Sequence, residues 1–487
     1  MQDPVAGAAA AEPGLAHAPQ APRQAGKAGA GDAEAWLFDA YPHKTRSAIV
    51  VWVKHGGDVS KRLVPYQPHF CVKADRMRLE DAERLLADDA RVARTWRDRS
   101  RLWLRGPEQE VLRVQPKRLQ DVWHVATDLR RRSRTKGFVF FDVDHGAESR
   151  WMHANGLWSM CRLQVDASGE PLLRRHPADE RFTVHYPDPG LRSLRLEVKA
   201  QRKGPTEDFA DPLESIRIGT DTFTCPHPGD PDAERDTVTA AIARLRELDP
   251  DVVATRHGDR FDVPYLLRRI QELGLRHELS LGREGDPEPE RPDQAAKSIH
   301  TYGRWLFKTH AYYLRGRWHI DLAKKTLDSE DDRKDLHGIV YLARVSNRRA
   351  QDVNRNGAGF ALQQIQVDLA TDWGVALPWK RNLAEDWKDA ATLCAVDRGG
   401  QIMVPDPGVY EDVIACDFSG YYPSLVVRHN LSSDSLNCTC CPDGPTIPEL
   451  GYHVCQKAMG HQATVLARLA EHRKWAKAVL RRAKTGN

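Results

Sequence analysis

The sequence predicts a mixed α/β (α+β) protein of several domains, and three observations lead to this fold class. The chain has 487 residues, whereas one domain typically has roughly 100 to 200. Short strand-like segments, such as residues 48–53, mark the first part of the chain. Further along, strand-like and helix-like segments alternate, which is typical of an α/β domain. We therefore expect a β-rich N-terminal domain, an α/β domain and a third region.

The composition excludes several classes of protein. Hydrophobic residues make up 41% and charged residues 29%, and no apolar run is long enough to span a bilayer. Lys and Arg outnumber Asp and Glu by only 72 to 68, so net charge alone does not indicate nucleic acid. The nine cysteines are odd in number and unevenly spaced, unlike a secreted disulfide framework. We expect a globular protein without a membrane partner.

The first segment, residues 1–34, is rich in Ala, Pro, Gly and Gln and has few large side chains. Such a composition cannot bury a core, so we expect a disordered tail. The tail lacks the apolar centre of a signal peptide, so we also expect a cytoplasmic protein.

The N-terminal domain is expected at residues 35–190. After the strand at 48–53, a helix of mixed charge is predicted at about 79–86. A basic run follows, which could contact phosphates or form a solvated face. Its members are Arg130, Arg131, Arg132, Arg134 and Lys136.

The second domain is expected at residues 191–345, after a Pro-Asp-Pro-Gly turn signal. The third region is expected at residues 346–487, with a helix at 363–373, a strand at 413–416 and a basic C-terminal helix. The elements predicted in the second domain are strands at 194–198, 214–219 and 251–254 and a helix at 233–248.

In the third region the apolar strand at 413–416 ends on a carboxylate, Asp417, just before a helix start. Nucleotidyl transfer uses two Mg²⁺ ions roughly 3.5 to 4 Å apart on hard oxygen ligands. A carboxylate at a strand end is a rigid ligand of this kind, and N–H groups at a helix start can hold phosphates. An Asp here can also be a turn or cap residue, so its neighbours decide between these functions.

Those neighbours resemble the first conserved polymerase motif of family B DNA polymerases, Asp-Phe-x-Ser-Leu-Tyr-Pro-Ser-Ile. The resemblance implies that Asp417 is the catalytic Mg²⁺ ligand and that Tyr422 is a steric gate against a 2′-hydroxyl. In place of the usual Ser and Leu, the chain has Gly420 and Tyr421. The matching residues are Asp417, Phe418, Tyr422, Pro423 and Ser424, and the residues implied at the nucleotide are Phe418, Ser419, Gly420, Tyr421 and Tyr422.

Two further segments resemble the same family. Gly399 and Gly400 are similar to a Tyr-x-Gly-Gly linker that contacts template DNA, although Asp397 replaces the Tyr; a Gly-Gly turn is the alternative. Arg473, Lys477 and Arg481 are spaced for one face of a helix. In the family a basic fingers helix grips the triphosphate, which implies nucleotide contacts for Arg473 and Lys477; a solvated basic face is the alternative.

The resemblance also implies a ribonuclease-H-like 3′–5′ exonuclease domain at residues 191–345. Its first motif, Asp-x-Glu, reads Glu197 and Lys199, and its second keeps Asp262 but has His257 for the usual Asn. The third, Tyr-x-x-x-Asp, reads Tyr341 and Val345. A cation and an apolar group at ligand positions cannot hold two divalent ions, so we predict no proofreading.

Another acidic segment, Asp142-Val143-Asp144, is assigned to the end of the N-terminal domain and not to the nuclease. The resemblance extends from about Trp36 to the C-terminus and is most specific after Arg344. The chain closely resembles a bacterial and archaeal branch with inactivated exonuclease domains. Loss of proofreading would point toward a role in DNA repair or damage tolerance, and the sequence leaves DNA replication, DNA repair and damage bypass open.

Four clustered cysteines offer enough soft ligands for a tetrahedral Zn²⁺ site, with His453 nearby. The spacing is irregular, and we expect adjacent Cys440 and Cys441 not to face one ion easily, so buried or idle thiols are the alternative. The four residues are Cys438, Cys440, Cys441 and Cys455.

The second polymerase carboxylate motif, usually Asp-Thr-Asp, does not occur after Asp417. We therefore expect a chain truncated within the palm and fingers. One hypothesis is that the chain is part of a DNA-directed DNA polymerase, which uses primer-template DNA and deoxynucleoside triphosphates and is completed by a second polypeptide. The other is a catalytically silent polymerase relative that binds DNA.

Overall fold

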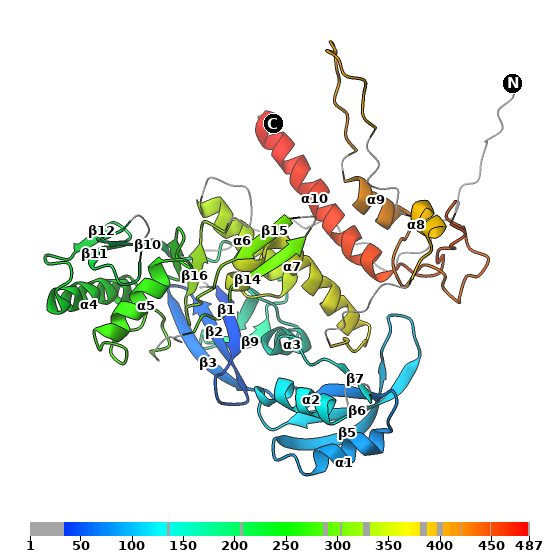
Figure 1. The fold of residues 1–487 in the computed structure, drawn as a ribbon, viewed down its shortest axis with the longest axis horizontal. Helices are drawn as coiled ribbons and strands as arrows, with labels where there is room; N and C mark the ends of the chain where they lie inside the picture. The colour runs from blue at the N-terminus through cyan, green and yellow to red at the C-terminus, as the bar shows by residue number, and fades with distance from the viewer. Residues whose placement is uncertain are drawn as a thin grey trace.

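The computed structural model confirms the mixed α/β fold class, with several sheets and helices in separate parts of the chain (Figure 1). Of the expected tail, only residue 34 is described. The structure describes residues 34–133, 137–204, 208–285, 291–301, 304–324, 332–379, 387–396, 403–418, 420–448 and 450–485.

The first N-terminal sheet has the strand order β3-β2-β1-β8-β9. Its strands β1 and β2 are buried at nearly every position, because α3 (Ala147–Ala154) covers one face and the following domain covers the other. Burial on both faces explains the continuous apolar run at 48–53. The strands are β1 (Ala35–Pro42), β2 (Ala48–His55), β3 (Asp58–Pro65), β8 (Arg162–Val165) and β9 (Pro171–Arg175).

The second N-terminal sheet has the order β5-β6-β4-β7 and packs on α1 (Leu79–Ala87) and α2 (Asp121–Arg132). Helix α1 buries Leu79, Ala82 and Leu86, the spacing of one helix face. The predicted helix at 79–86 is therefore confirmed. The strands are β4 (Phe70–Ala74), β5 (Val92–Arg101), β6 (Glu108–Pro116) and β7 (Phe138–Phe141).

The next domain has a sheet of order β12-β11-β10-β13-β16, with β10, β11 and β12 antiparallel and β10, β13 and β16 parallel. Helices α4 (Pro231–Leu248) and α5 (Asp262–Glu272) pack on it. This order and these directions agree with the expected ribonuclease-H-like fold. The strands are β10 (Ser193–Ala200), β11 (Leu213–Ile218), β12 (Asp221–Thr224), β13 (Val252–Thr255) and β16 (Trp318–Asp321).

Between β13 and β16 the chain forms a two-stranded hairpin, β14 (Lys297–Thr301) and β15 (Arg304–Lys308). Helices α6 (Asp332–Ser346) and α7 (Ala350–Asp372) follow. Helix α7 is kinked at Gly357, whose φ of 73° and ψ of −170° are not helical. The part before the kink is bonded to β16: Gln351 and Asn354 accept hydrogen bonds from the backbone of His319 and Asp321.

The last region contains α8 (Ala390–Val396), α9 (Tyr421–Arg428) and α10 (His461–Thr485), which confirms the basic C-terminal helix. Among its described residues there is no named strand, so the strand predicted at 413–416 is wrong for this chain. Val413 and Ile414 are 73% and 84% exposed, in an extended loop, residues 403–418, that protrudes from the body (Figure 1). A strand needs a hydrogen-bonded neighbour, and the described residues supply none here.

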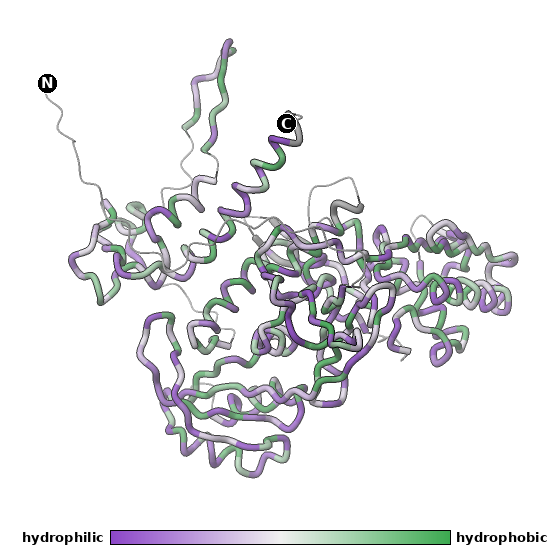
Figure 2. The backbone as a smooth tube through the Cα atoms, turned by 180° about the vertical axis from the view of Figure 1, so that it is seen from behind, coloured by the Kyte–Doolittle hydropathy of each residue, from purple (hydrophilic) through white to green (hydrophobic). Residues whose placement is uncertain are grey.

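Figure 2 shows hydrophobic stretches of the backbone on this protruding loop as well as inside the domains. None of the described helices is both long and apolar enough to cross a membrane.

Candidate functional site

The residues of the first two nuclease motifs lie at one groove of the ribonuclease-H-like domain. Glu197 and Lys199 alternate along β10 with buried Leu196 and Val198, so both project from the same face of the strand. Asp262, the first residue of α5, lines the same groove, which has a volume of about 570 Å³. The structure thus brings the three residues together, and their role stays a prediction.

The groove is poorly suited to metal ions. Glu197 forms an ion pair with Arg217 of the adjacent strand, and the buried Asp262 accepts a hydrogen bond of 3.0 Å from the backbone N–H of Val198. The cations Lys199, Arg202 and Arg256 also line the groove, together with a further carboxylate, Glu214. Over the described ranges, no three carboxylate, His or Cys ligand atoms gather here closely enough for one ion. Two-metal chemistry requires such a gathering.

The residues read as the third motif lie elsewhere. Tyr341 donates to or accepts from His472 of α10 at 2.6 Å, and Val345 is buried with Ile365 and Val465 in a core between α6, α7 and α10. Neither residue lines the groove of Glu197 and Asp262. The interpretation of this pair as a decayed ligand position is therefore corrected: its side chains connect helices.

A buried charge cluster at the carboxyl ends of β13 and β16 was missed by the sequence analysis. The Arg355 Nε lies 2.9 Å from Asp259 Oδ2, Lys324 pairs with the same carboxylate, and His319 Nδ1 is 3.6 Å from Asp259 Oδ1. Burial would raise the pKa of Asp259, but these cations hold it well below its usual range. Burial and the charge of Arg355 lower the pKa of His319 to about 4.

This cluster borders a second, cationic groove of about 320 Å³ at the base of the β14–β15 hairpin. Lys297 and Lys308 are directly opposite each other across the hairpin, and like charges in such a pair repel. Burial, with Lys297 and Lys324 nearby, lowers the pKa of Lys308. The basic residues that line this groove are Arg260, Lys297, Lys308, Lys324 and Arg355.

Two aromatic side chains project from the same hairpin. Trp305 and Phe307 are 75% and 71% exposed, and their spacing of two places both on one face of β15. Exposed aromatic rings beside a basic groove form the arrangement that binds single-stranded nucleic acid, because bases stack on the rings while cations contact phosphates.

The segment that resembles the first polymerase motif lies at the start of α9. Asp417 is exposed, and the rings of Phe418, Tyr421 and Tyr422 follow one another at centroid distances of 5.4 and 5.6 Å. Gly420 has a φ of 67°, and a Cβ there would lie 3.4 Å from the guanidinium of Arg473. The structure thus brings Arg473 of α10 to the motif. Lys477 lies one helical turn beyond Arg473.

Three predicted site residues, Gly399, Gly400 and Ser419, lie outside the described residues. The described part of the first basic run makes contacts within the protein. Arg130 lies 5.4 Å from the ring centre of Trp379, and Arg132 donates to the carbonyl of Leu85 at 2.9 Å. These contacts favour a structural function for this run over a phosphate site.

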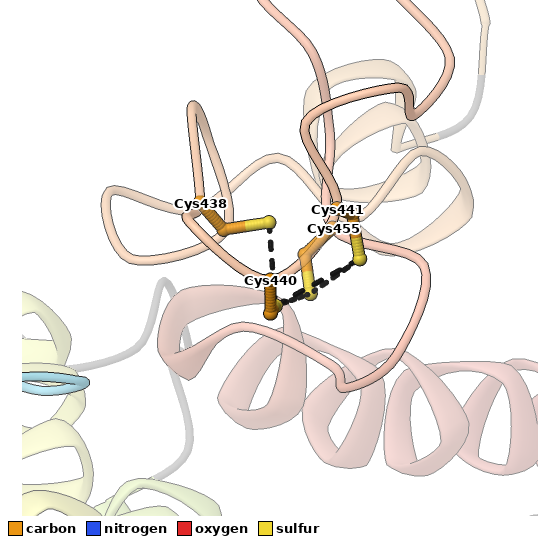
Figure 3. Close-up of side chains that lie close together, drawn as sticks. All are labelled: Cys438, Cys440, Cys441 and Cys455. Carbon is orange, nitrogen blue, oxygen red and sulfur yellow. Dashed lines mark hydrogen bonds between the residues drawn. The ribbon is translucent and has the colours of Figure 1, made fainter.

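The four predicted cysteine ligands converge, as Figure 3 shows. Their sulfur atoms all lie within 4.8 Å of one another, so the expectation that Cys440 and Cys441 would not face one point is wrong. The chain after Cys441 loops back and brings the sulfur of Cys455 to 3.6 Å from that of Cys440 and 4.0 Å from that of Cys441. His453 is not part of the group, because its Nε2 contacts the carbonyl of Cys438 at 2.8 Å.

Arg105, from the turn between β5 and β6, also reaches the cysteines. Its Nη1 is 2.9 Å from Cys455 Sγ. Burial opposes ionisation of Cys455, but hydrogen bonds from the backbone of Ala458 and from Arg105 lower its pKa to about 6.

The sheet order defines a multidomain protein with a ribonuclease-H-like domain behind a β-rich N-terminal domain. A family model described as the exonuclease domain of DNA polymerase family B matches residues 231–329. The chain is therefore related to the family B DNA polymerases.

Individual relatives agree with this. DNA polymerase 1 of Pyrococcus abyssi is 24% identical over 352 residues, covering 62% of this chain and 45% of the relative. A DNA polymerase of Thermococcus litoralis is 25% identical over 350 residues, covering 61% of this chain and 20% of the relative. The chain thus spans less than half the length of these relatives.

Among solved structures, the family B DNA polymerase from the archaeon Pyrobaculum calidifontis matches in fold. The TM-score is 0.64 at 20% identity, and the match covers 93% of this chain and 64% of that chain. The fold likeness therefore includes the N-terminal and C-terminal regions, well beyond the exonuclease-like domain.

Proposed function

We propose that this chain is the N-terminal portion of a family B DNA-directed DNA polymerase, that it holds primer-template DNA, and that its exonuclease-like domain does not proofread. The observation that carries the DNA-binding part is the cationic groove at the β14–β15 hairpin. There Lys297 and Lys308 repel each other, and a phosphate between them would relieve the repulsion. Exposed Trp305 and Phe307 beside the groove offer stacking surfaces.

The test measures binding of a fluorescent single strand and of a primer-template over a range of salt. The double variant Lys297→Ala/Lys308→Ala should weaken binding and reduce the slope of log K against log salt by roughly 1 to 2. Trp305→Ala should weaken single-strand binding by about 1 to 3 kcal/mol. The double variant Lys44→Ala/Lys117→Ala removes two exposed lysines of the N-terminal domain and is the matched control. Equal binding by all variants would refute the site.

The proofreading part is supported by the groove at Glu197, Lys199 and Asp262, where cations stand among the carboxylates. Purified protein with Mg²⁺ or Mn²⁺ should release no nucleotides from a single-stranded 3′ end. Release that disappears in Asp262→Ala would contradict this, whereas release that persists in the variant indicates a contaminating nuclease.

For polymerisation, Asp417 would supply one Mg²⁺ ligand, and the exposed Tyr421 and Tyr422 with Arg473 would contact the deoxynucleoside triphosphate. The fit is partial. Asp417 is exposed, and across the described residues it belongs to no group of three metal-ligating side chains. The remaining carboxylates would come from a second polypeptide or from further sequence. The same source would supply a strand that pairs with residues 413–416.

Primer extension separates this proposal from a silent DNA-binding relative. The chain alone should not extend a primer with Mg²⁺ and deoxynucleotides. Extension after adding a fragment that carries the second carboxylate motif, lost in Asp417→Ala, supports the split enzyme. DNA binding without extension under every such condition supports the silent relative, which the exposure of Asp417 also favours.

A further inference from the structure

We propose that Cys438, Cys440, Cys441 and Cys455 bind a single Zn²⁺ ion, and that this ion locks the segment between α9 and α10 onto the N-terminal domain through Arg105. The inference does not depend on polymerase activity. It concerns a structural metal and a contact between parts of the chain that are more than 300 residues apart in sequence.

The distances between the sulfur atoms fit one tetrahedral ion. Cys440 Sγ lies 3.5, 3.7 and 3.6 Å from the sulfur atoms of Cys438, Cys441 and Cys455, and Cys441 lies 4.0 Å from Cys455. The other two distances, from Cys438 to Cys441 and to Cys455, are within 4.8 Å. Four thiolates at the Zn–S distance of about 2.3 Å stand roughly 3.8 Å apart at the corners of a tetrahedron. Sulfur atoms joined as disulfides would be about 2.05 Å apart.

The same distances disfavour an iron–sulfur cluster. In a four-iron cluster each thiolate binds a different iron, so the four cysteine sulfurs are spread around the whole cluster. Here the four sulfurs surround a single point (Figure 3). Zn²⁺ is a borderline-soft ion with no geometric preference of its own, and it suits a tetrahedral site of four sulfur ligands.

The segment needs such an ion because it has almost no core of its own. Within the described residues from 429 to 460, the buried apolar side chains are Cys438, Val454 and Cys455, and pairing is limited to isolated bridges such as Leu436 with Val454. A loop-rich unit of this size usually depends on a metal or disulfides for a fixed fold. Two of its three buried apolar residues are thus the proposed ligands.

Arg105 places a positive charge beside the proposed thiolate ligands. A Zn²⁺ ion with four thiolates carries a net charge of −2, which is costly to bury without a cation. The Arg105 guanidinium contacts Cys455 Sγ at 2.9 Å and forms an ion pair with Asp434 at 2.9 Å. It also donates to the carbonyls of Ala458 and Met459 at 3.2 and 3.3 Å. One arginine of the β5–β6 turn therefore contacts four residues of the segment.

The segment in turn fixes how α9 and α10 are placed. The Asn430 side chain, two residues after α9, donates to the carbonyls of Cys455 and Ala458 and accepts from the N–H of Gly460, the residue before α10. Zinc would therefore hold the start of α10, and with it Arg473, relative to the end of α9.

The first test measures metal content by elemental analysis of the whole chain purified without added metal. We expect about one zinc per chain, retained in Cys416→Ser, which changes an exposed cysteine outside the group. Cys438→Ser/Cys455→Ser should lose it. Wild-type protein in which Co²⁺ replaces Zn²⁺ should show the thiolate charge-transfer and d–d absorption of tetrahedral cobalt. This readout does not require a cysteine variant to fold.

The second test measures hydrogen exchange with and without a strong chelator. Removal of the ion should increase exchange at residues 430–460 and in the β5–β6 turn together. Arg105→Met should keep the zinc but increase exchange in the turn, whereas Arg76→Met, at an exposed arginine before α1, should change neither. Protein without zinc, protein with iron and visible absorption, or chelation that leaves both segments unchanged would overturn the proposal.

Discussion

Arg355 of α7 and Asp259 of the ribonuclease-H-like domain form a buried ion pair, with 2.9 Å between Nε and Oδ2 and side chains that are 2% and 0% exposed. The two residues are 96 positions apart. The pair joins the helix that leads into the C-terminal region to the carboxyl ends of the central parallel strands.

Removing one partner of this pair should be strongly destabilising. Arg355→Met removes one of the cations that balance the buried negative charge of Asp259. Such a change typically lowers the free energy of unfolding by about 3 to 5 kcal/mol. Urea unfolding followed by fluorescence measures it. Arg84→Met removes a cation whose partner Asp81 is near the surface and should cost less than about 1 kcal/mol. Equal effects of the two variants would contradict the buried pair.

His319 should make the fold sensitive to mild acid. Burial lowers its pKa in the folded state to about 4, whereas a histidine in an unfolded chain has a pKa of about 6.5. Between these values the unfolded state binds more protons. The stabilisation that His319 provides is therefore complete above about pH 6.5 and decreases as the pH falls toward 4, by on the order of 3 kcal/mol.

Melting temperatures across this pH range would measure the effect. His319→Gln should flatten the dependence, and His124→Gln, at an exposed histidine of α2, should leave it unchanged. A slope identical in all three proteins would exclude His319 as the source.

Gly258 should tolerate no side chain. A Cβ there would overlap Thr255 and lie 2.7 Å from His319 Nε2, and these two side chains are bonded to each other at 2.8 Å. We expect Gly258→Ala to cost about 1 to 3 kcal/mol. At Gly359, in α7, a Cβ would meet no atom within 4 Å, and Gly359→Ala should stabilise by about 0.5 to 1 kcal/mol. Chemical denaturation that gives both variants the same sign would refute the prediction.

The stacking of Phe38 on Trp318 should hold the N-terminal domain to the following one. The ring centres are 4.6 Å apart at an angle of 11°, and both side chains are fully buried. Phe38→Ala should cost about 3 to 5 kcal/mol. Phe307→Ala, at a 71% exposed ring, should be nearly neutral in the same unfolding assay. A small loss for Phe38→Ala would mean that the two domains are held by other contacts.

The regular elements of the nuclease-like domain could be predicted because local patterns determine them. Predicted strands at 194–198 and 251–254 and the helix at 233–248 match β10, β13 and α4. Helix α4 begins with Asp230 accepting from the backbone of Asp232 and with a Pro in its first turn, which are signals that a sequence shows directly.

The charge cluster around Asp259 could not be predicted in the same way. Asp259 is within the motif that contains Asp262, but its partner Arg355 comes from a later helix and has no local signal. The expectation that Cys440 and Cys441 would not face one ion was also wrong. The directions of their side chains depend on how the chain after Cys441 folds back toward them, which has no local signal in the sequence. The strand at 413–416 failed for the opposite reason: its local pattern is strong, but the described residues provide no neighbouring strand.

The protruding loop at residues 403–418 has a practical consequence for handling the protein. The segment Val413-Ile414-Ala415-Cys416 is short, apolar, rich in strand-forming residues and exposed, which are the properties that promote intermolecular β-stacking and aggregation. Acidic residues stand at both ends, Asp412 before it and Asp417 after it, and such flanking charges act as gatekeepers against self-assembly. Asp417 would thus also keep the isolated chain from precipitating, and neutralising it should lower solubility at high protein concentration.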